Sequence, residues 1–274
     1  MDNRLDDPVG AARAFVQERY PGALAAFLGG STARGAGTPT SDLDIVLVLP
    51  APAQVRGENL LWGGWPVELF VHTRESVLGF MEFDRSRGSG TMAFMCASGV
   101  VLHDRDGTAE QLRDAARRTL AAGPPAPEPA VLERARYDVT DLRDDLLGAN
   151  ATNDDADADA DELLAIAATL LERTAGLLFA VRNHWHGGGK WLPRRLREAD
   201  PELADSLLDG YRTLVRGGPR EPFAEAVAAV LDRCGGPLWA GYRRVPDARM
   251  LAYLREGADS AADPRLEAQP SDRA

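Results

Sequence analysis

The chain has 274 residues, enough for one large domain or two of moderate size. Its 45% hydrophobic and 27% charged content is ordinary for a soluble globular protein. The formal net charge of −11 argues against nucleic acid as the main partner, because phosphate binding needs a basic surface, and is compatible with a cationic small molecule. The N-terminus has no apolar signal segment and uninterrupted apolar runs are short, so we expect no export and no membrane span. Two cysteines without a CxxC pair favour a cytoplasmic location.

The first 122 residues predict an α+β domain, a small mixed sheet with helices. Helical patterns cover 5–19, 74–86 and 108–121, and strand patterns cover 24–28, 43–49 and 99–102. Two further runs, 59–62 and 67–72, flank Gly63 and Gly64. This pattern favours a hairpin, because glycine readily adopts the positive φ of a tight turn.

A proline-rich stretch at 123–130 predicts a linker, because its four prolines cannot continue a helix. Beyond it the strand patterns nearly vanish, and helical patterns cover 130–148, 161–184, 200–216 and 220–233. We therefore expect domains at 1–122 and 131–258, the second an all-α helical bundle. The Asp/Ala-rich run 153–161 predicts a solvated loop, and 259–274 a disordered tail.

Asp42 and Asp44 are the first candidates for chemistry. On a strand, residues i and i+2 point to the same face, so these two carboxylates project side by side. Two adjacent anions repel unless a cation lies between them, and Mg²⁺ prefers carboxylate oxygens. Taken alone, the Asp-x-Asp pattern favours an acidic turn that merely opens a strand.

The preceding loop, Gly29 to Ser41, favours the metal interpretation. Gly29, Gly30 and Ser31 follow a predicted strand directly, and glycines let backbone N–H groups approach phosphate oxygens. The loop is not a Walker loop, since no Gly-Lys-Ser/Thr follows, and its spacing does not fit a dinucleotide-binding fingerprint.

Taken together, Gly29-Gly30-Ser31, ten further residues and Asp42-Leu43-Asp44-Ile45 resemble the signature of the DNA polymerase β-like nucleotidyltransferase superfamily. The segment Ser31-Thr32-Ala33-Arg34-Gly35, and Ser41 directly before Asp42, also resemble this signature. The resemblance implies that Asp42 and Asp44 hold Mg²⁺, with two ions expected. It also implies that Gly29, Gly30, Ser31, Arg34 and Ser41 bind the phosphates of ATP or another NTP.

The superfamily uses a third carboxylate, and Glu68 is our candidate. It interrupts the apolar segment 66–72, where Val67, Leu69 and Val71 alternate onto one face and leave Glu68 on the other. A charged residue in such a strand is explained by a metal-binding or proton-transfer role. The segment is similar to that of streptomycin- and spectinomycin-type aminoglycoside adenylyltransferases, which implies that Glu68 is the general base.

Lys190 is the only lysine among 31 basic residues, and it lies in a glycine-rich loop after the second predicted helix of the C-terminal domain. Lysine supplies a compact point charge where arginine supplies a planar fork. In the same adenylyltransferases a lysine in such a loop contacts the triphosphate, which implies this role for Lys190.

We therefore expect a Mg²⁺-dependent enzyme that moves an NMP group, with AMP from ATP as the first choice, onto a hydroxyl of a small molecule. An aminoglycoside is one such acceptor. Two alternatives stay open from the sequence: a protein- or RNA-directed nucleotidyltransferase of the AMP-adding antitoxin type, and a non-catalytic nucleotide-binding relative.

Overall fold

The computed structural model describes residues 7–149, 156–245 and 250–254. The chain divides into two compact units, Met1–Pro237 and Leu238–Ala274. The predicted linker at 123–130 lies inside the first unit, so the domain limits 1–122 and 131–258 stay a prediction. The predicted tail 259–274 lies outside the described residues.

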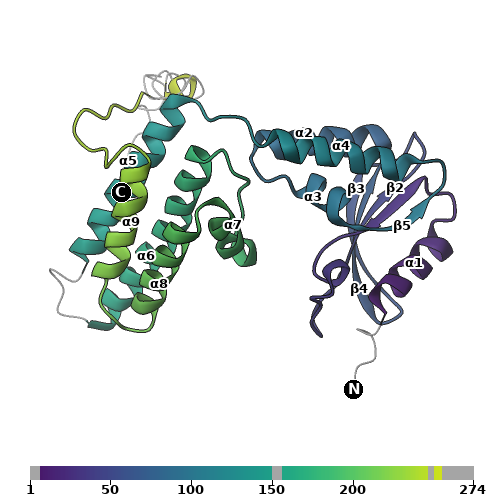
Figure 1. The fold of residues 1–274 in the computed structure, drawn as a ribbon, viewed down its shortest axis with the longest axis horizontal. Coiled ribbons are helices and arrows are strands. Elements are labelled where there is room, and N and C mark those ends of the chain that lie inside the picture. Colours follow the sequence, from purple (N-terminus) through teal and green to yellow (C-terminus); the bar gives the residue numbers. More distant parts are fainter. Residues whose placement is uncertain (1–6, 150–155, 246–249, 255–274) are drawn as a thin grey trace, which may run out of the picture. The chain divides into compact units, whose positions relative to one another are not determined.

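A five-stranded mixed sheet forms the N-terminal part of the first unit (Figure 1). Its strands are β1 (Ala25–Leu28), β2 (Leu43–Val48), β3 (Arg56–Trp62), β4 (Trp65–His72) and β5 (Val100–Asp104). They lie in the order β3-β4-β2-β1-β5. β2 and β4 pair in parallel, and the other neighbours pair antiparallel. The predicted hairpin is confirmed, with φ of 55° at Gly63 and 83° at Gly64 between β3 and β4.

Helices cover both faces of this sheet. They are α1 (Pro8–Arg19), α2 (Arg74–Ser86), α3 (Thr91–Ser98) and α4 (Thr108–Ala122). Leu43, Ile45 and Leu47 of β2 pack in one core with α1. Val46 and Val48 point to the other face and pack with α2, α3 and α4. Burial on both faces explains why β2 is a continuous apolar run after Asp44.

A helical region follows, as the sequence predicts, so the expected fold class is confirmed (Figure 1). Its helices are α5 (Pro129–Gly148), α6 (Ala156–Val181), α7 (Leu192–Ala199), α8 (Pro201–Val215) and α9 (Glu221–Arg233), with a 3-10 turn η3 (Gly189–Trp191) before α7. A core of aliphatic side chains from α5 to α9 surrounds Phe179 and Phe223.

Two details of the helical region differ from the sequence expectation. Residues 156–161 belong to α6, so the predicted loop at 153–161 is wrong for that part, and its remainder lies outside the described residues. The alanines of this run favour a helix. The short helices α3 and α7 were not expected from the sequence.

Helix α6 is unusually apolar. Its stretch Ala160–Val181 is long and apolar enough to cross a membrane by length and composition, with a mean hydropathy of 1.6. Leu170, Leu177 and Phe179 of this stretch are buried in the core of the helical region. About 39% of the apolar window is buried inside the structure, so this core accounts for part of the apolar surface of α6.

Candidate active site

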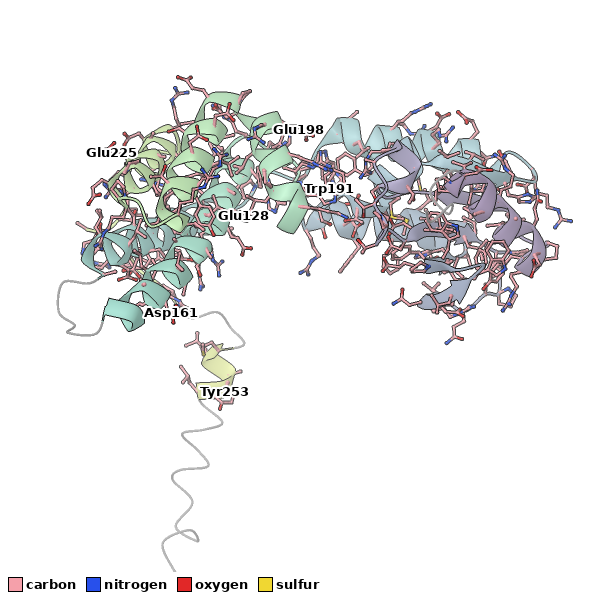
Figure 2. All side chains as sticks on the ribbon, turned by 90° about the horizontal axis from the view of Figure 1, so that it is seen from below. Glu128, Asp161, Trp191, Glu198, Glu225 and Tyr253 are labelled. Atoms are coloured by element: carbon pink, nitrogen blue, oxygen red, sulfur yellow. The ribbon has the colours of Figure 1, made fainter. Side chains whose placement is uncertain are left out.

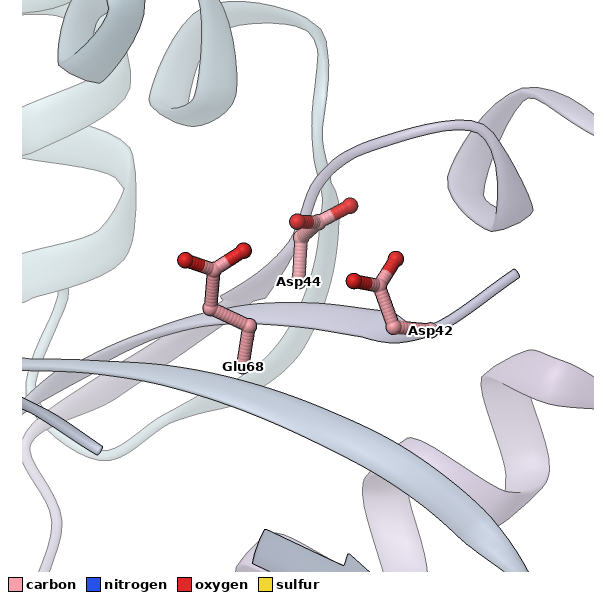
Figure 3. A group of neighbouring side chains, drawn as sticks. All are labelled: Asp42, Asp44 and Glu68. Atoms are coloured by element: carbon pink, nitrogen blue, oxygen red, sulfur yellow. The ribbon is translucent and has the colours of Figure 1, made fainter. Parts of the chain in front are cut away.

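Three carboxylates converge at the beginning of β2. Asp42 directly precedes this strand, Asp44 is its second residue, and Glu68 of β4 is the register partner of Asp44. One carboxylate oxygen from each of the three residues lies within 4.8 Å of the others. Figure 3 shows the three side chains pointing to the same side of the two strands. The parallel pairing of β2 and β4 therefore brings together the residues that the sequence predicted as a set.

The electrostatics of this cluster favour a bound cation. Burial, the charges of Asp42 and Glu68 and a hydrogen bond with Glu68 raise the pKa of Asp44 to about 6, and the charge of Lys190 acts in the opposite direction. Three half-buried carboxylates at such short range repel one another unless a positive charge lies among them. Mg²⁺ takes oxygen ligands of this kind. The donor set therefore fits a hard divalent cation.

The glycine at position 30 fits against the metal-binding candidate Asp44. Gly30 has a φ of 68°, and a Cβ added there would lie 1.6 Å from Oδ2 of Asp44. The backbone N–H of Gly29 donates to the carbonyl of Asp44 at 2.8 Å. Since any side chain at position 30 would collide with the carboxylate, the loop can pass this close only with glycine there.

Serine and threonine hydroxyls hold the rest of the loop in place. The Oγ atoms of Ser31 and Ser41 lie 3.1 Å apart, which joins the two ends of the loop. Ser41 Oγ also accepts from the backbone N–H of Thr38 at 2.9 Å, and Thr32 Oγ1 donates to the carbonyl of Asp42 at 3.3 Å. These bonds fix the loop beside the carboxylates, where the predicted phosphate contacts of Ser31 and Ser41 would be made.

A cavity of about 740 Å³ opens next to Asp44. Of the residues predicted to bind nucleotide, Gly29, Gly30, Ser31, Arg34 and Lys190 line it. Asp42, Ser41 and Glu68 are not among the described residues that form its wall. Lys190, 146 positions along the chain from Asp44, thus lines the same cavity.

Trp191, next to Lys190 in η3, contacts Arg34 of the Gly29–Ser41 loop. The guanidinium carbon of Arg34 lies 4.8 Å from the centroid of a Trp191 ring, and that of Arg194 lies 5.0 Å from it. A cation over an indole face is attracted by the ring quadrupole. The contact therefore holds Arg34 against the beginning of α7, where Figure 2 labels Trp191.

Several residues of the cavity wall were not expected from the sequence. Arg195 of α7 is 9% exposed, lies 3.9 Å over the ring of Phe94 of α3, and pairs with Glu198 at 2.6 Å. The α6 wall adds Glu172, Gly176 and Phe179. None of these belongs to a motif, and only the packing of α3, α6 and α7 brings them together.

A protein-family model matches the part of the chain that forms the strand side of the site. Residues 10–84 match the family model described as "Nucleotidyltransferase domain". This part of the chain is therefore similar to a nucleotidyltransferase domain. The match covers Asp42, Asp44, Glu68 and the loop from Gly29 to Ser41, and it ends before α3 and the helical region.

A solved structure is similar over most of the chain, at a distant level. It is the nucleotidyltransferase-like protein from Exiguobacterium sibiricum 255-15, with 13% sequence identity and a TM-score of 0.40. The likeness covers 95% of this chain and 91% of that one. At this identity and score it carries no argument about function. No curated protein sequence matches the chain.

Proposed function

We propose that this protein is a metal-dependent nucleotidyltransferase that moves an NMP group from an NTP onto a hydroxyl of a small molecule and releases pyrophosphate. The observation that carries the proposal is the convergence of Asp42, Asp44 and Glu68 beside the glycine-serine loop, within the part of the chain that matches the nucleotidyltransferase domain. ATP is the NTP we would test first.

Each residue has a distinct part in the proposed reaction. Asp42, Asp44 and Glu68 would hold Mg²⁺, and we propose two ions. Bound metal would supply charge neutralisation for the phosphate oxygens during an in-line displacement. Glu68 takes the proton of the acceptor hydroxyl, whose oxygen then forms a bond to the α-phosphorus. The bond from that phosphorus to the pyrophosphate oxygen breaks, and Lys190 offsets the charge that develops on the leaving group.

The proposal also names the chemical class of the acceptor. We propose a small hydroxyl-bearing molecule, with cationic aminoglycosides as the first class to test. The net charge of −11 supports a cationic acceptor over a nucleic acid, and the segment around Glu68 resembles that of aminoglycoside adenylyltransferases. We also propose a cytoplasmic location, supported by two cysteines that are both free and buried.

Transfer of labelled AMP tests the proposal. Purified protein is incubated with Mg²⁺, ATP labelled at the α-phosphate and a panel of aminoglycosides, and the products are separated by mass. We expect a labelled acceptor with the wild type and none with Asp42→Asn. Labelled protein or RNA in a lysate, without any labelled small molecule, would overturn the small-molecule acceptor but keep the enzyme class. Equal calorimetric binding of Mg-ATP by wild type and Asp42→Asn would overturn the metal assignment.

A further inference from the structure

Gly176 lies inside the long helix α6, where glycine is, after proline, the least favourable residue. Its backbone requires no glycine, because it is absent from the positive-φ residues of the chain. Its packing requires none either, because a Cβ added at this position would meet no atom within 4 Å. Gly176 lines the cavity beside Asp44. The space in front of Gly176 is therefore part of that cavity.

The cavity wall around Gly176 combines apolar side chains with the carboxylate of Glu172. Glu172, Gly176 and Phe179 follow one another at helical spacing along α6, so they share one face. Phe94 and Met95 of α3 and Leu192 of α7 line the same cavity. Because Gly176 has no side chain, this wall exposes helix backbone beside aromatic and aliphatic groups, which suits a flat ring.

The residues proposed to bind the phosphates come from other elements of the cavity wall. Gly30, Ser31 and Arg34 come from the Gly29–Ser41 loop, and Lys190 comes from η3. A nucleoside triphosphate has the same division, with a polyanionic chain and a flat, largely apolar base. An acceptor hydroxyl must instead reach Glu68, which is not among the described residues of this wall. The division of the lining therefore matches the nucleotide better than the acceptor.

We propose that the base of the NTP packs on the α6 wall at Gly176, and that the missing side chain of this residue provides the room for it. The inference rests on the proposed function, since it concerns the nucleotide of that reaction. It assigns a ligand-binding role to a helix residue that no motif marks.

Helix α2 offers a matched control. Gly79 also lies in a helix interior, a Cβ added to it also meets no atom within 4 Å, and it is not part of the cavity lining. Replacing either glycine by alanine or leucine favours the helix to a similar extent. Only the change at position 176 places atoms in the cavity.

The test is calorimetric binding of two probes, Mg-ATP and Mg-tripolyphosphate, to the wild type and to Gly176→Leu and Gly79→Leu. Tripolyphosphate has the phosphate chain without the base. For Gly176→Leu we expect at least about a ten-fold loss of ATP affinity, and less than about a two-fold change for tripolyphosphate. Gly79→Leu should bind both probes as the wild type does, and thermal unfolding should show that both variants remain folded.

Any of the following results would overturn the inference. One is wild-type affinity of Gly176→Leu for ATP, and another is an equal loss of ATP and tripolyphosphate affinity, which would indicate a distorted phosphate site. The third is a failure of the wild type to bind Mg-ATP, which would overturn the proposed function as well. If the wild type transfers AMP and Gly176→Leu binds ATP with wild-type affinity, this inference is wrong but the proposed function stands. The smaller variant Gly176→Ala should give a weaker effect in the same direction.

Discussion

Asp44 and Glu68 are register partners on the parallel strands β2 and β4. Burial, the charges of Asp42 and Glu68 and a hydrogen bond with Glu68 raise the pKa of Asp44 to about 6. Below this pH Asp44 holds a proton, and above it the charged carboxylate is available to a cation.

The first prediction concerns stability and pH without divalent cations. The folded pKa of Asp44 lies above the ordinary value of about 3.9, so the native state is favoured when Asp44 is protonated. Its contribution is fully present below about pH 4 and is lost as the pH rises to about 6. Urea unfolding of wild type and Asp44→Asn should give free energies that diverge over this range, with the variant the more stable at pH 7. A difference that is constant from pH 4 to 7 would contradict the assigned pKa.

The same proton competes with the metal. At fixed Mg²⁺, the affinity of the wild type for Mg²⁺ should fall as the pH drops below 6, by up to about ten-fold per pH unit, because the cation must displace the proton of Asp44. Calorimetry with Mg²⁺ between pH 5 and 8 measures this directly. A flat profile would mean that Asp44 is not a ligand.

The close approach of Gly30 to Asp44 predicts a specific defect in Gly30→Ala. Gly35 is the matched control, because its φ of 66° is nearly that of Gly30 and a Cβ there meets no atom within 4 Å. We expect Gly35→Ala to lose about 1–2 kcal/mol of stability from backbone strain alone. Gly30→Ala should lose more, and should also lose Mg²⁺ binding, since the new methyl group displaces the Asp44 carboxylate. Equal behaviour of the two variants would rule out the role of this contact.

Glu68→Gln separates proton transfer from binding. The amide keeps the shape of the side chain but cannot take a proton, so kcat should fall by about 10²–10⁴-fold. The KM for the NTP should stay within a few-fold of the wild type, because Asp42 and Asp44 still hold the cation. A rise in KM with little change in kcat would instead make Glu68 mainly a metal ligand.

We predict that replacing Lys190 raises the KM for the NTP, and that arginine at this position restores only part of the affinity. Lys190→Ala should raise the KM for the NTP by about ten-fold or more, the loss expected for a charge-assisted hydrogen bond to phosphate. Lys190→Arg should recover part of it, since the charge returns but with a larger, planar group. Arg194→Ala is the control, because Arg194 carries the same charge over Trp191 without lining the cavity. Equal losses in both alanine variants would indicate only a general effect of charge.

The sequence predicted the strand half of the site well, because that half obeys local rules. Asp42 and Asp44 are two positions apart, Glu68 interrupts a period-two pattern, and the Gly63-Gly64 turn fixes the hairpin next to it. Side-chain alternation places each carboxylate on one face of its strand, and the parallel pairing of β2 and β4 then brings the three together.

The helical half of the site could not be predicted in the same way. The α3 segment, Thr91–Ser98, is apolar on nearly every side and has no helical period, because it lies between the sheet and α4. Helix α7 is short and has a proline in its first turn, which is favourable there but resembles a loop when read along the chain. The positions of Gly176 and Arg195 on the cavity depend on how these helices pack, which no local pattern encodes.

The contact between Arg34 and Trp191 has a consequence for recognition. The guanidinium of Arg34 lies over the Trp191 ring, and a cation–π contact does not use the N–H groups that bind phosphate oxygens. Trp191 thus restricts the rotamers of a long, exposed side chain without consuming its hydrogen bonds. Part of the entropy lost on binding an anion is then already lost in the folded protein, so the indole, which carries no charge itself, strengthens anion binding through its neighbour.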